Sequence, residues 1–258
     1  MLSREEEKAL CFYEGDVEQT GDPFFSDAKA YVTWNALLFD GMETEYARIR
    51  EGRRLNPAFL CDPERVIALS LDLIRSFSHM PKRQEEMITY RVERLIDYRA
   101  FCSAGRMTSF ISTSCSGFLN SYRDKEDLVL MIVHISPEIP CGDLGYMLEE
   151  YRKAEETEIL LAPYLIINSV EKEISDSLKT ITDRNGNPPA VVCDIYPEYS
   201  PLKKEVHPEW LTSEYISASV SVYEALNAGR QPEENSIRMY LKFKQALQAE
   251  LLERMGQL

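Results

Sequence analysis

A change in the spacing of apolar residues divides this chain into three stretches. Up to Pro81 the apolar residues recur every three or four positions, as they do along one face of a helix. From residue 82 to about residue 200 they form short runs or alternate with polar residues, which is typical of strands. After Ser200 the helical spacing returns. Because the strands arrive with few long helices between them, the pattern favours an α+β fold over a doubly wound sheet.

The two outer stretches predict helices. One extends from Ser26 to about Arg50 with a break near Gly41, and a second begins at Asp62-Pro63, an N-cap residue followed by a proline at the first helical position. Two more are expected over Trp210–Leu226 and Pro232–Met255. We expect a catalytic domain over residues 1–200, with a helical part (1–81) and a β core (82–200), and a helical extension over 201–258. The apolar stripe of the last helix predicts packing on its own domain, with a surface for a partner helix as the alternative.

The middle stretch predicts a series of short strands. A short helix over Glu93–Cys102 is expected after the first of them. Asn-Gly at the centre of a turn near residue 185 predicts a hairpin between Leu178–Asp183 and Ala190–Tyr196. The remaining expected strands are Met87–Val92, Met107–Ser114, Leu128–Ile135, Glu158–Leu161 and Tyr164–Ser169.

Charge and composition exclude several classes of partner. The chain has 258 residues, of which 44% are apolar, enough for a folded core. Its net charge of −14 argues against nucleic acid and against an anionic membrane surface. The first residues, MLSREEEKAL, are acidic where a secretory signal would be basic and then apolar. We therefore expect a cytoplasmic protein, or one exported without such a signal, with neither nucleic acid nor membrane as a partner.

Cysteines and histidines offer no metal or redox motif. The three histidines match neither the HExxH spacing nor a Gly-x-Ser-x-Gly turn, and His134 is expected to be a satisfied residue in an apolar strand. No metal is expected. The cysteines contain no CxxC pair and are expected to be reduced and mostly buried; they are Cys11, Cys61, Cys102, Cys115, Cys141 and Cys193.

Polar residues suited to chemistry occur in three segments of the β stretch. Glu156 and Glu158 lie two residues apart at the entrance of an apolar strand and therefore project to the same face. Burying two like charges side by side is unfavourable, which indicates that they are used. Upstream, Arg91 lies in one expected strand and Ser112-Thr113-Ser114 ends the next. A Glu-x-Glu segment is common in a chain with 43 acidic residues, and an arginine in a strand or a Ser-Thr-Ser segment is common in any chain. The informative feature is the order in which the three segments occur.

Arginine, then Ser-Thr-Ser, then Glu-x-Glu resembles the arginine-specific mono-ADP-ribosyltransferases, the R-S-E class that includes the catalytic domains of clostridial binary toxins. The resemblance covers roughly residues 25–200. It implies an ADP-ribosyltransferase-like fold of two packed, mostly antiparallel sheets with N-terminal helices. It also implies transfer of ADP-ribose from NAD to a protein arginine with release of nicotinamide. A bacterial toxin or effector is the natural setting of such an enzyme.

The resemblance assigns a role to each segment. Cleavage of NAD develops an oxocarbenium-like ribose, which Glu158 would stabilise, while Ser112 fixes the Glu158 rotamer. Arg91 would bind the diphosphate with its guanidinium fork. Glu156 would hold the acceptor guanidinium, since glutamate at this position accompanies arginine modification in the family. The wider set of expected NAD contacts is Tyr90, Ser109, Thr113, Ser114, Phe118, Tyr122 and Arg123, the last three by their position in a loop.

Three alternatives stay open. The same site can serve a NAD glycohydrolase that uses water, or the fold can serve as a non-catalytic binding module. Arg91 and Glu158 can also form a buried ion pair in an unrelated α+β protein.

Three features depart from the family pattern. Val92 stands where glycine usually follows the arginine, and Ser109 stands where asparagine is often found three residues before the first serine. Glu155 precedes Glu156, so a shift of one residue changes which carboxylate faces the site.

Overall fold

The computed structural model describes residues 2–14, 22–25, 30–81, 83–115, 127–147, 158–175, 181–183, 185–200 and 202–258. Its contacts divide the chain into two compact units, a helical unit (residues 1–76 and 201–258) and a sheet unit (residues 77–200). The predicted domains, with a boundary at residue 200, remain a prediction.

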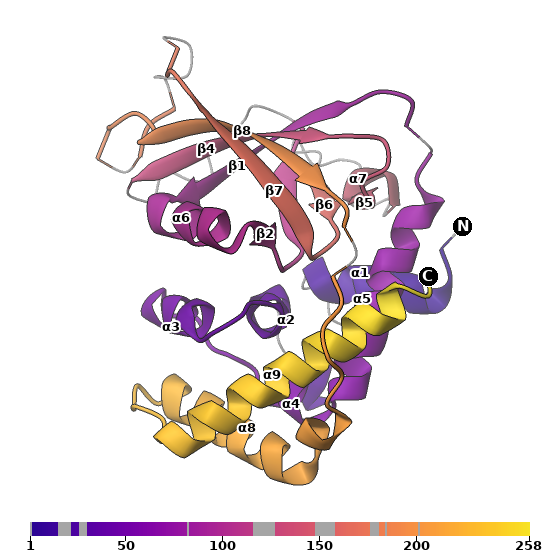
Figure 1. Ribbon diagram of the computed structural model, residues 1–258, viewed down its shortest axis with the longest axis vertical. Helices are drawn as coiled ribbons and strands as arrows, with labels where there is room; N and C mark the ends of the chain where they lie inside the picture. Colours follow the sequence, from indigo (N-terminus) through magenta and orange to yellow (C-terminus); the bar gives the residue numbers. More distant parts are fainter. Residues whose placement is uncertain are drawn as a thin grey trace. The chain divides into compact units, whose positions relative to one another are not determined.

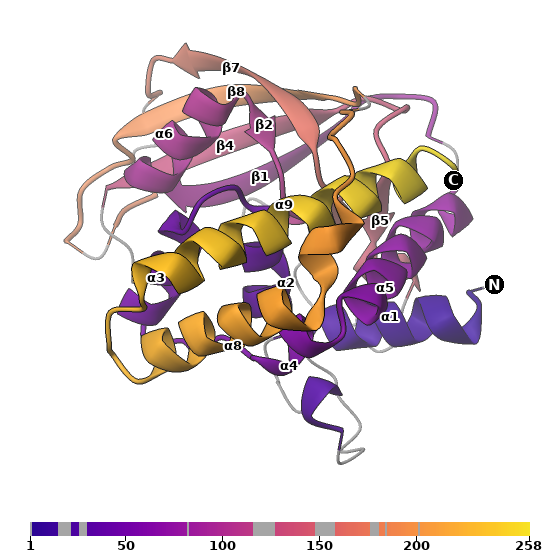
Figure 2. The same ribbon diagram turned by 60° about the horizontal axis from the view of Figure 1, so that its bottom comes forward.

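The helical unit joins the two ends of the chain. In Figure 2, α9 and α8 lie side by side, consistent with their direct contact. Its helices and one-turn 3-10 helices (η) are α1 (Arg4–Glu14), η1 (Pro23–Phe25), α2 (Ala30–Leu38), α3 (Glu43–Arg50), α4 (Ala58–Cys61), α5 (Pro63–Ser76), η6 (Pro208–Leu211), α8 (Ser213–Asn227) and α9 (Glu234–Met255).

Local signals account for these helices. Gly41 adopts φ +71° between α2 and α3, a left-handed conformation that favours glycine, and confirms the predicted break. The Asp62 side chain accepts a hydrogen bond of 3.1 Å from the backbone N–H of Arg65, as an N-cap should, and α5 begins at Pro63. Leu247 and Leu251 are fully buried, so the apolar stripe of α9 packs within its own unit, as predicted. Ser26 lies outside the described residues.

Within the described residues, the sheet unit contains one sheet of eight strands in the order β2-β7-β8-β4-β1-β3-β6-β5. Figure 1 shows this sheet with all of its strands except β3 labelled. The neighbours β4 and β8 are parallel, and every other registered pair is antiparallel. The elements of this unit are η2 (Phe77–His79), β1 (Met87–Arg94), α6 (Leu95–Ala104), β2 (Arg106–Met107), β3 (Ile111–Ser114), β4 (Leu128–Ile135), β5 (Cys141–Asp143), α7 (Leu144–Met147), β6 (Glu158–Leu161), β7 (Leu165–Lys172) and β8 (Val191–Glu198).

The prediction of two packed sheets is wrong, although the α+β class is confirmed. β1 pairs with β4 along eight residues and also with β3 through the single pair Tyr90 and Ser114. That one pair joins β3, β6 and β5 to the other five strands. The alternation of side chains within a strand made the strands predictable from the sequence. It does not indicate which strands are neighbours, because pairing depends on segments far apart in the chain.

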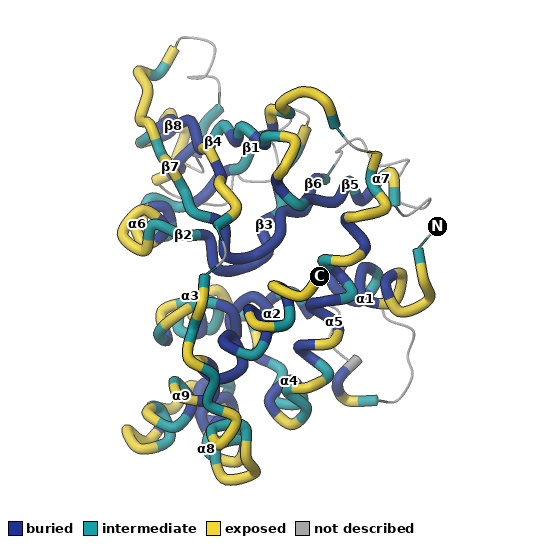
Figure 3. The backbone as a smooth tube through the Cα atoms, turned by 45° about the vertical axis from the view of Figure 1, so that its right-hand side comes forward, coloured by how far each residue is buried: buried dark blue, intermediate teal, exposed yellow. Residues whose placement is uncertain are grey.

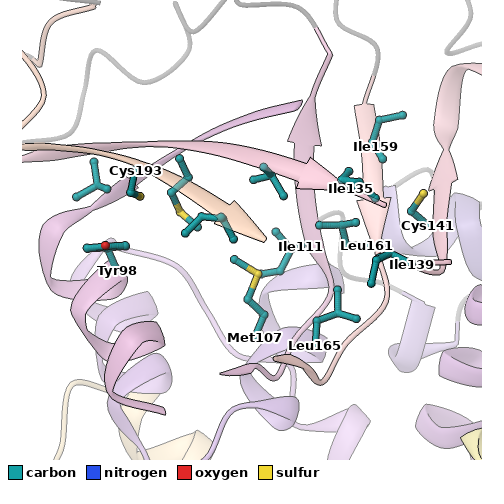
Figure 4. Close-up of a cluster of buried hydrophobic side chains, with 14 residues drawn as sticks. Tyr98, Met107, Ile111, Ile135, Ile139, Cys141, Ile159, Leu161, Leu165 and Cys193 are labelled. Atoms are coloured by element: carbon teal, nitrogen blue, oxygen red, sulfur yellow. The ribbon is translucent and has the colours of Figure 1, made fainter. Parts of the chain in front are cut away.

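One side of the sheet covers the main core of this unit (Figure 4). Tyr98 of α6 packs into that cluster, together with apolar residues from β3, β4, β6 and β8. In Figure 3 the outward side of α6 is exposed, whereas β3 alternates between buried and intermediate residues. The residues of the cluster that Figure 4 labels are Tyr98, Met107, Ile111, Ile135, Ile139, Cys141, Ile159, Leu161, Leu165 and Cys193.

The predicted hairpin is wrong in its described part. Residues 181–183 form no strand, and β8 instead lies between β4 and β7. The Asp183 carboxylate accepts hydrogen bonds of 2.8 Å from the backbone N–H groups of both Asn185 and Asn187, which closes the loop on itself. The backbone turn is present as well, since the N–H of Gly186 donates a hydrogen bond of 3.0 Å to the Asp183 carbonyl, but it does not join two paired strands.

The cysteines agree with the prediction only in part. All six are free thiols, as expected. Cys141 and Cys193 are buried, but Cys61, Cys102 and Cys115 are exposed, so the prediction that most are buried is wrong. Burial raises the pKa of the Cys193 thiol to about 11.

Candidate active site

Three of the predicted residues meet on one face of neighbouring strands. In the antiparallel ladder of β3 and β6, Ser114 lies opposite Glu158 and Ser112 lies opposite Leu160. Side chains of opposite residues in a ladder point to the same face, so Ser112, Ser114 and Glu158 form one polar row, which we call the serine–glutamate face. Ser112 is the diagonal neighbour of Glu158, at a Cα separation of about 7–8 Å that a long side chain can span.

The residue between the two serines has a different environment. Thr113 is buried on the opposite face, where its Oγ1 donates a hydrogen bond of 3.1 Å to the carbonyl of Ile159. That bond adds a side-chain link between β3 and β6, in the same register that places Ser114 opposite Glu158. Ser109, just before β3, is likewise buried. The expectation that Thr113 and Ser109 contact NAD stays a prediction.

Tyr90 and Arg91 of β1 approach this face in different ways. Tyr90 lies opposite Ser114 and shares its face. The side chain of the next residue, Arg91, leaves β1 on the opposite face of the sheet from that of Tyr90. Its guanidinium extends to the adjacent strand β3, where Nη1 donates a hydrogen bond of 2.6 Å to the Ser112 carbonyl. Arg91, Ser112 and Glu158 thus lie on three neighbouring strands, and a hydrogen bond joins the first two; their roles in a reaction stay a prediction.

Glu93 is a member of this group that the sequence interpretation missed. Its Oε1 accepts a hydrogen bond of 2.7 Å from Arg91 Nε, and the same oxygen forms an ion pair with Arg91 Nη2. Glu93 and Arg91 lie two residues apart on β1 and project to the same face. The two-residue spacing can be seen in the sequence. Glu93 was missed because the predicted strand ended at Val92 and Glu93 was taken as the first residue of the following helix. The helix in fact begins at Leu95.

The other predicted site residues lie outside the described residues. They are Glu156, Phe118, Tyr122 and Arg123. The described part of the chain holds no cluster of histidine, cysteine and carboxylate side chains that suits a metal ion. Among the described helices, none is both long and apolar enough to cross a membrane.

A second polar cluster lies on β4, β7 and β8. The two ring nitrogens of His134 lie 2.9 Å from a Glu86 oxygen and 3.1 Å from an Asp194 oxygen, and its ring stacks on Tyr196. Burial disfavours the imidazolium, but the hydrogen bonds to Glu86 and Asp194 outweigh it and raise the pKa of His134. Asp194 is also paired with Lys172. Both ring nitrogens of His134 thus have partners within the protein, as predicted. We therefore interpret these residues as a structural cluster.

The helical unit holds a cavity of about 360 Å³. Two ammonium groups line it, but Lys204 is paired with Asp40 and Lys244 with the buried Glu45. With both charges already balanced, the cavity has no excess charge to attract an ion. Its full lining is Asp40, Gly41, Lys204, Leu241, Lys244, Gln245 and Gln248.

Comparisons with known proteins give partial likenesses only. No protein-family model and no curated protein matches the chain. Among solved structures, it is similar to the catalytic domain of VahC from Aeromonas hydrophila, with TM-score 0.47 and 14% identity over 77% of this chain and 100% of that one. It is also similar to the Salmonella SpvB ATR domain, with TM-score 0.46 and 14% identity over 76% of this chain and 100% of that one.

A third similar structure is Plx2a, an ADP-ribosyltransferase toxin from Paenibacillus larvae, with TM-score 0.42 and 13% identity over 77% of this chain and 88% of that one. Because these scores and identities are low, we base the proposed function on the residues and contacts of this chain.

Proposed function

We propose that this protein is a mono-ADP-ribosyltransferase that moves ADP-ribose from NAD to a protein arginine. The observation that carries the proposal is the shared face of Ser112, Ser114 and Glu158, with the Arg91 guanidinium hydrogen-bonded to the Ser112 backbone. These are the residues that the sequence resemblance singled out, and they come from three neighbouring strands. As in the family that the chain resembles, a bacterial toxin or effector is the proposed setting.

The chemistry follows from what each group offers. The nicotinamide of NAD already carries positive charge, so it leaves without an acid, and the ribose carbon becomes electron-poor as the glycosidic bond breaks. A carboxylate facing that carbon stabilises the developing charge and accepts a hydrogen bond from a ribose hydroxyl. Glu158 is the described carboxylate of the serine–glutamate face and takes this role in the proposal. The hydroxyls of Ser112 and Ser114 hold its side chain in position.

The proposed acceptor is a protein arginine, and it rests on Glu156. A guanidinium stays protonated at neutral pH, with a pKa above about 12, so it must be oriented and must lose a proton as it attacks the ribose carbon. Glu156 is the proposed partner for that guanidinium. The bond from nicotinamide to ribose breaks, a bond from the acceptor nitrogen to the same carbon forms, and the acceptor's proton passes to the carboxylate.

The test uses NAD labelled in its adenylate part, a guanidino acceptor or cell lysate, and separate measurements of nicotinamide release and labelling. We expect Glu158→Gln to lower both by about 100-fold or more, because it removes the charge that the transition state needs. The matched control is Glu171→Gln, which neutralises an exposed carboxylate on β7 and should change neither rate. Equal rates for wild type and Glu158→Gln would refute the proposed role of Glu158.

Glu156→Gln separates transfer from hydrolysis. If Glu156 holds the acceptor, this variant releases nicotinamide but labels no protein. Nicotinamide release by the wild type without labelling of any acceptor would instead favour the NAD glycohydrolase. A wild-type protein that neither binds NAD nor releases nicotinamide would leave only a binding module.

A further inference from the structure

We infer that Glu93 is a positioning residue, which holds the Arg91 guanidinium against β3 and so fixes Ser112 for the reaction. The inference rests on the proposed function, because it assigns a task within the same site. It starts from the contacts of one side chain with its neighbours. Arg91 uses Nε and Nη2 for the Glu93 carboxylate and Nη1 for the Ser112 carbonyl.

The geometry explains why both partners are needed. A guanidinium is planar, so two bonds on its Nε side determine where its third nitrogen points. The Glu93 carboxylate fixes the plane, and Nη1 is then aimed at the neighbouring strand, 2.6 Å from the Ser112 carbonyl. This matters because, within the described residues, the pair Tyr90 and Ser114 is the one backbone pair registered between β1 and β3. The Arg91 side chain supplies a second link between these strands, at the residue whose hydroxyl shares a face with Glu158.

Burial makes the arrangement persistent. The Glu93 side chain is 7% exposed and that of Arg91 is 21% exposed. A nearly buried carboxylate that loses its cation is strongly destabilised. An arriving diphosphate therefore cannot draw Arg91 away from Glu93, and the bond to Ser112 is retained when NAD binds. Any contact of Arg91 with NAD is made by a guanidinium that stays in this position.

The arrangement also limits how Arg91 acts on an anion. Since Glu93 balances its charge, Arg91 offers directed N–H groups more than a net positive field. Geometry and charge can be separated by two substitutions at one position. Glu93→Gln keeps an oxygen that accepts from Nε and Nη2 but removes the negative charge, whereas Glu93→Leu removes both.

The experiment compares steady-state nicotinamide release and thermal unfolding of these two variants with the wild type. We expect Glu93→Leu to lower kcat by about 100-fold, because small displacements of positioning groups have effects of that size. We expect Glu93→Gln to keep kcat within about threefold of wild type, and the KM for NAD to stay equal or fall, since repulsion of the diphosphate is removed. The matched control is Glu171→Leu on β7, which should leave kcat and KM unchanged.

Two outcomes would overturn the inference. One is a Glu93→Leu variant that folds and keeps the wild-type kcat. The other is a Glu93→Gln variant that loses as much activity as Glu93→Leu, because charge and not geometry would then be the requirement. If Glu93→Leu does not fold, a double-mutant cycle between Arg91→Lys and Glu93→Ala decides, because Glu93→Ala also removes the acceptor oxygen but adds no bulk. The losses in kcat/KM should be non-additive, and additive losses would overturn the inference.

A measurement without NAD distinguishes failure of the inference from failure of the proposed function. The Nε proton of Arg91, observed by NMR, should be protected from exchange in the wild type and in Glu93→Gln, and lose that protection in Glu93→Leu. Protection in all three proteins would refute the contact's role. A protected proton in a wild type that neither binds NAD nor releases nicotinamide would refute the proposed function and leave the Arg91 geometry intact.

Discussion

Each unit of the molecule buries an ion pair, and the two pairs differ in what surrounds them. In the helical unit, Lys244 of α9 and Glu45 of α3 are 2% and 0% exposed, and Nζ of Lys244 lies 2.6 Å from the carboxylate. Lys244 also donates to the Gly41 carbonyl, and the Tyr240 hydroxyl donates to the same Glu45 oxygen. In the sheet unit, Arg91 and Glu93 form a pair in which the cation retains some exposure.

This difference in exposure indicates that Lys244 and Glu45 form a structural ion pair, whereas Arg91 and Glu93 lie beside the candidate active site. The other partners of Lys244 and Glu45 are the Tyr240 hydroxyl and the Gly41 carbonyl, both within the helical unit, so the pair joins the helices α3 and α9. Arg91 links two strands of which one carries Ser112. A fully buried pair should therefore affect mainly folding, and a partly exposed pair beside a polar face should affect mainly activity.

The largest effect on stability is expected from Lys244→Met. It leaves Glu45 charged in an apolar interior, which should lower the free energy of unfolding by about 3–5 kcal/mol. Urea unfolding measures it, with Lys242→Met on the exposed side of the same helix as the control. The double variant Glu45→Met/Lys244→Met should recover much of the loss, since no charge is left unpaired. A double variant less stable than Lys244→Met would show that the pair is net stabilising.

Arg91→Met should have a smaller effect on stability and a larger one on activity. It leaves Glu93 without its cation, but water reaches this pair, so we expect a loss of about 2 kcal/mol. Nicotinamide release should fall at least tenfold because the link to Ser112 is lost (about 1.4 kcal/mol per factor of ten). Arg94→Met, on the same strand but paired with Asp97, is the control. Equal loss of activity in the two variants would contradict the contrast between the pairs.

His134→Gln tests a third set of interactions, those of His134 with Glu86 and Asp194, by the pH dependence of the free energy of unfolding. The pKa of His134 is raised in the folded protein, so its interactions with Glu86 and Asp194 contribute fully below the unfolded value of about 6.5. That contribution is lost as pH rises through the folded pKa. The wild type should exceed His134→Gln in stability by about 1 kcal/mol in mild acid, and the difference should shrink above about pH 6.5. A difference that grows with pH would show that the imidazolium is not the stabilised form.

The smallest effect is expected from Arg254→Ala. Arg254 pairs with Glu64 and with Glu250, and these side chains are accessible to solvent. Exposed pairs contribute about 0–1 kcal/mol, and salt weakens them further. Thermal unfolding at low and high salt measures the effect, with Arg75→Ala, which removes a second exposed pair, as a comparison. A loss as large as that of Lys244→Met would break the relation between burial and effect.

Strongly patterned segments could be predicted from the sequence. The bounds of β4 (Leu128–Ile135) and β6 (Glu158–Leu161) agree with the prediction, because long apolar runs and a turn beside a proline leave few alternatives. Ser112 and Glu158 were singled out from the order of the motifs. Their shared face follows from the pairing of β3 with β6, which the local pattern does not contain.

Features that depend on pairing between distant segments could not be predicted. The expectation of two sheets came from the family resemblance, and the sequence pattern could not correct it, because it contains no information on whether β1 and β3 pair. β5 (Cys141–Asp143) is too short to show an alternating pattern, and no strand was predicted there. Glu93 was missed through a boundary error of two residues, which moved it from a strand face to a helix start.

The exposure of Cys115 gives the molecule a natural attachment point for a reporter dye. This thiol immediately follows Ser114, at the end of the strand that carries the serine–glutamate face. Partial burial of its sulfur and the neighbouring Asp143 raise the pKa of the thiol, so alkylation should be slow at neutral pH and faster in mildly alkaline buffer. With Cys61 and Cys102 replaced by serine, a fluorophore on Cys115 would report the arrival of a nucleotide by its change in emission.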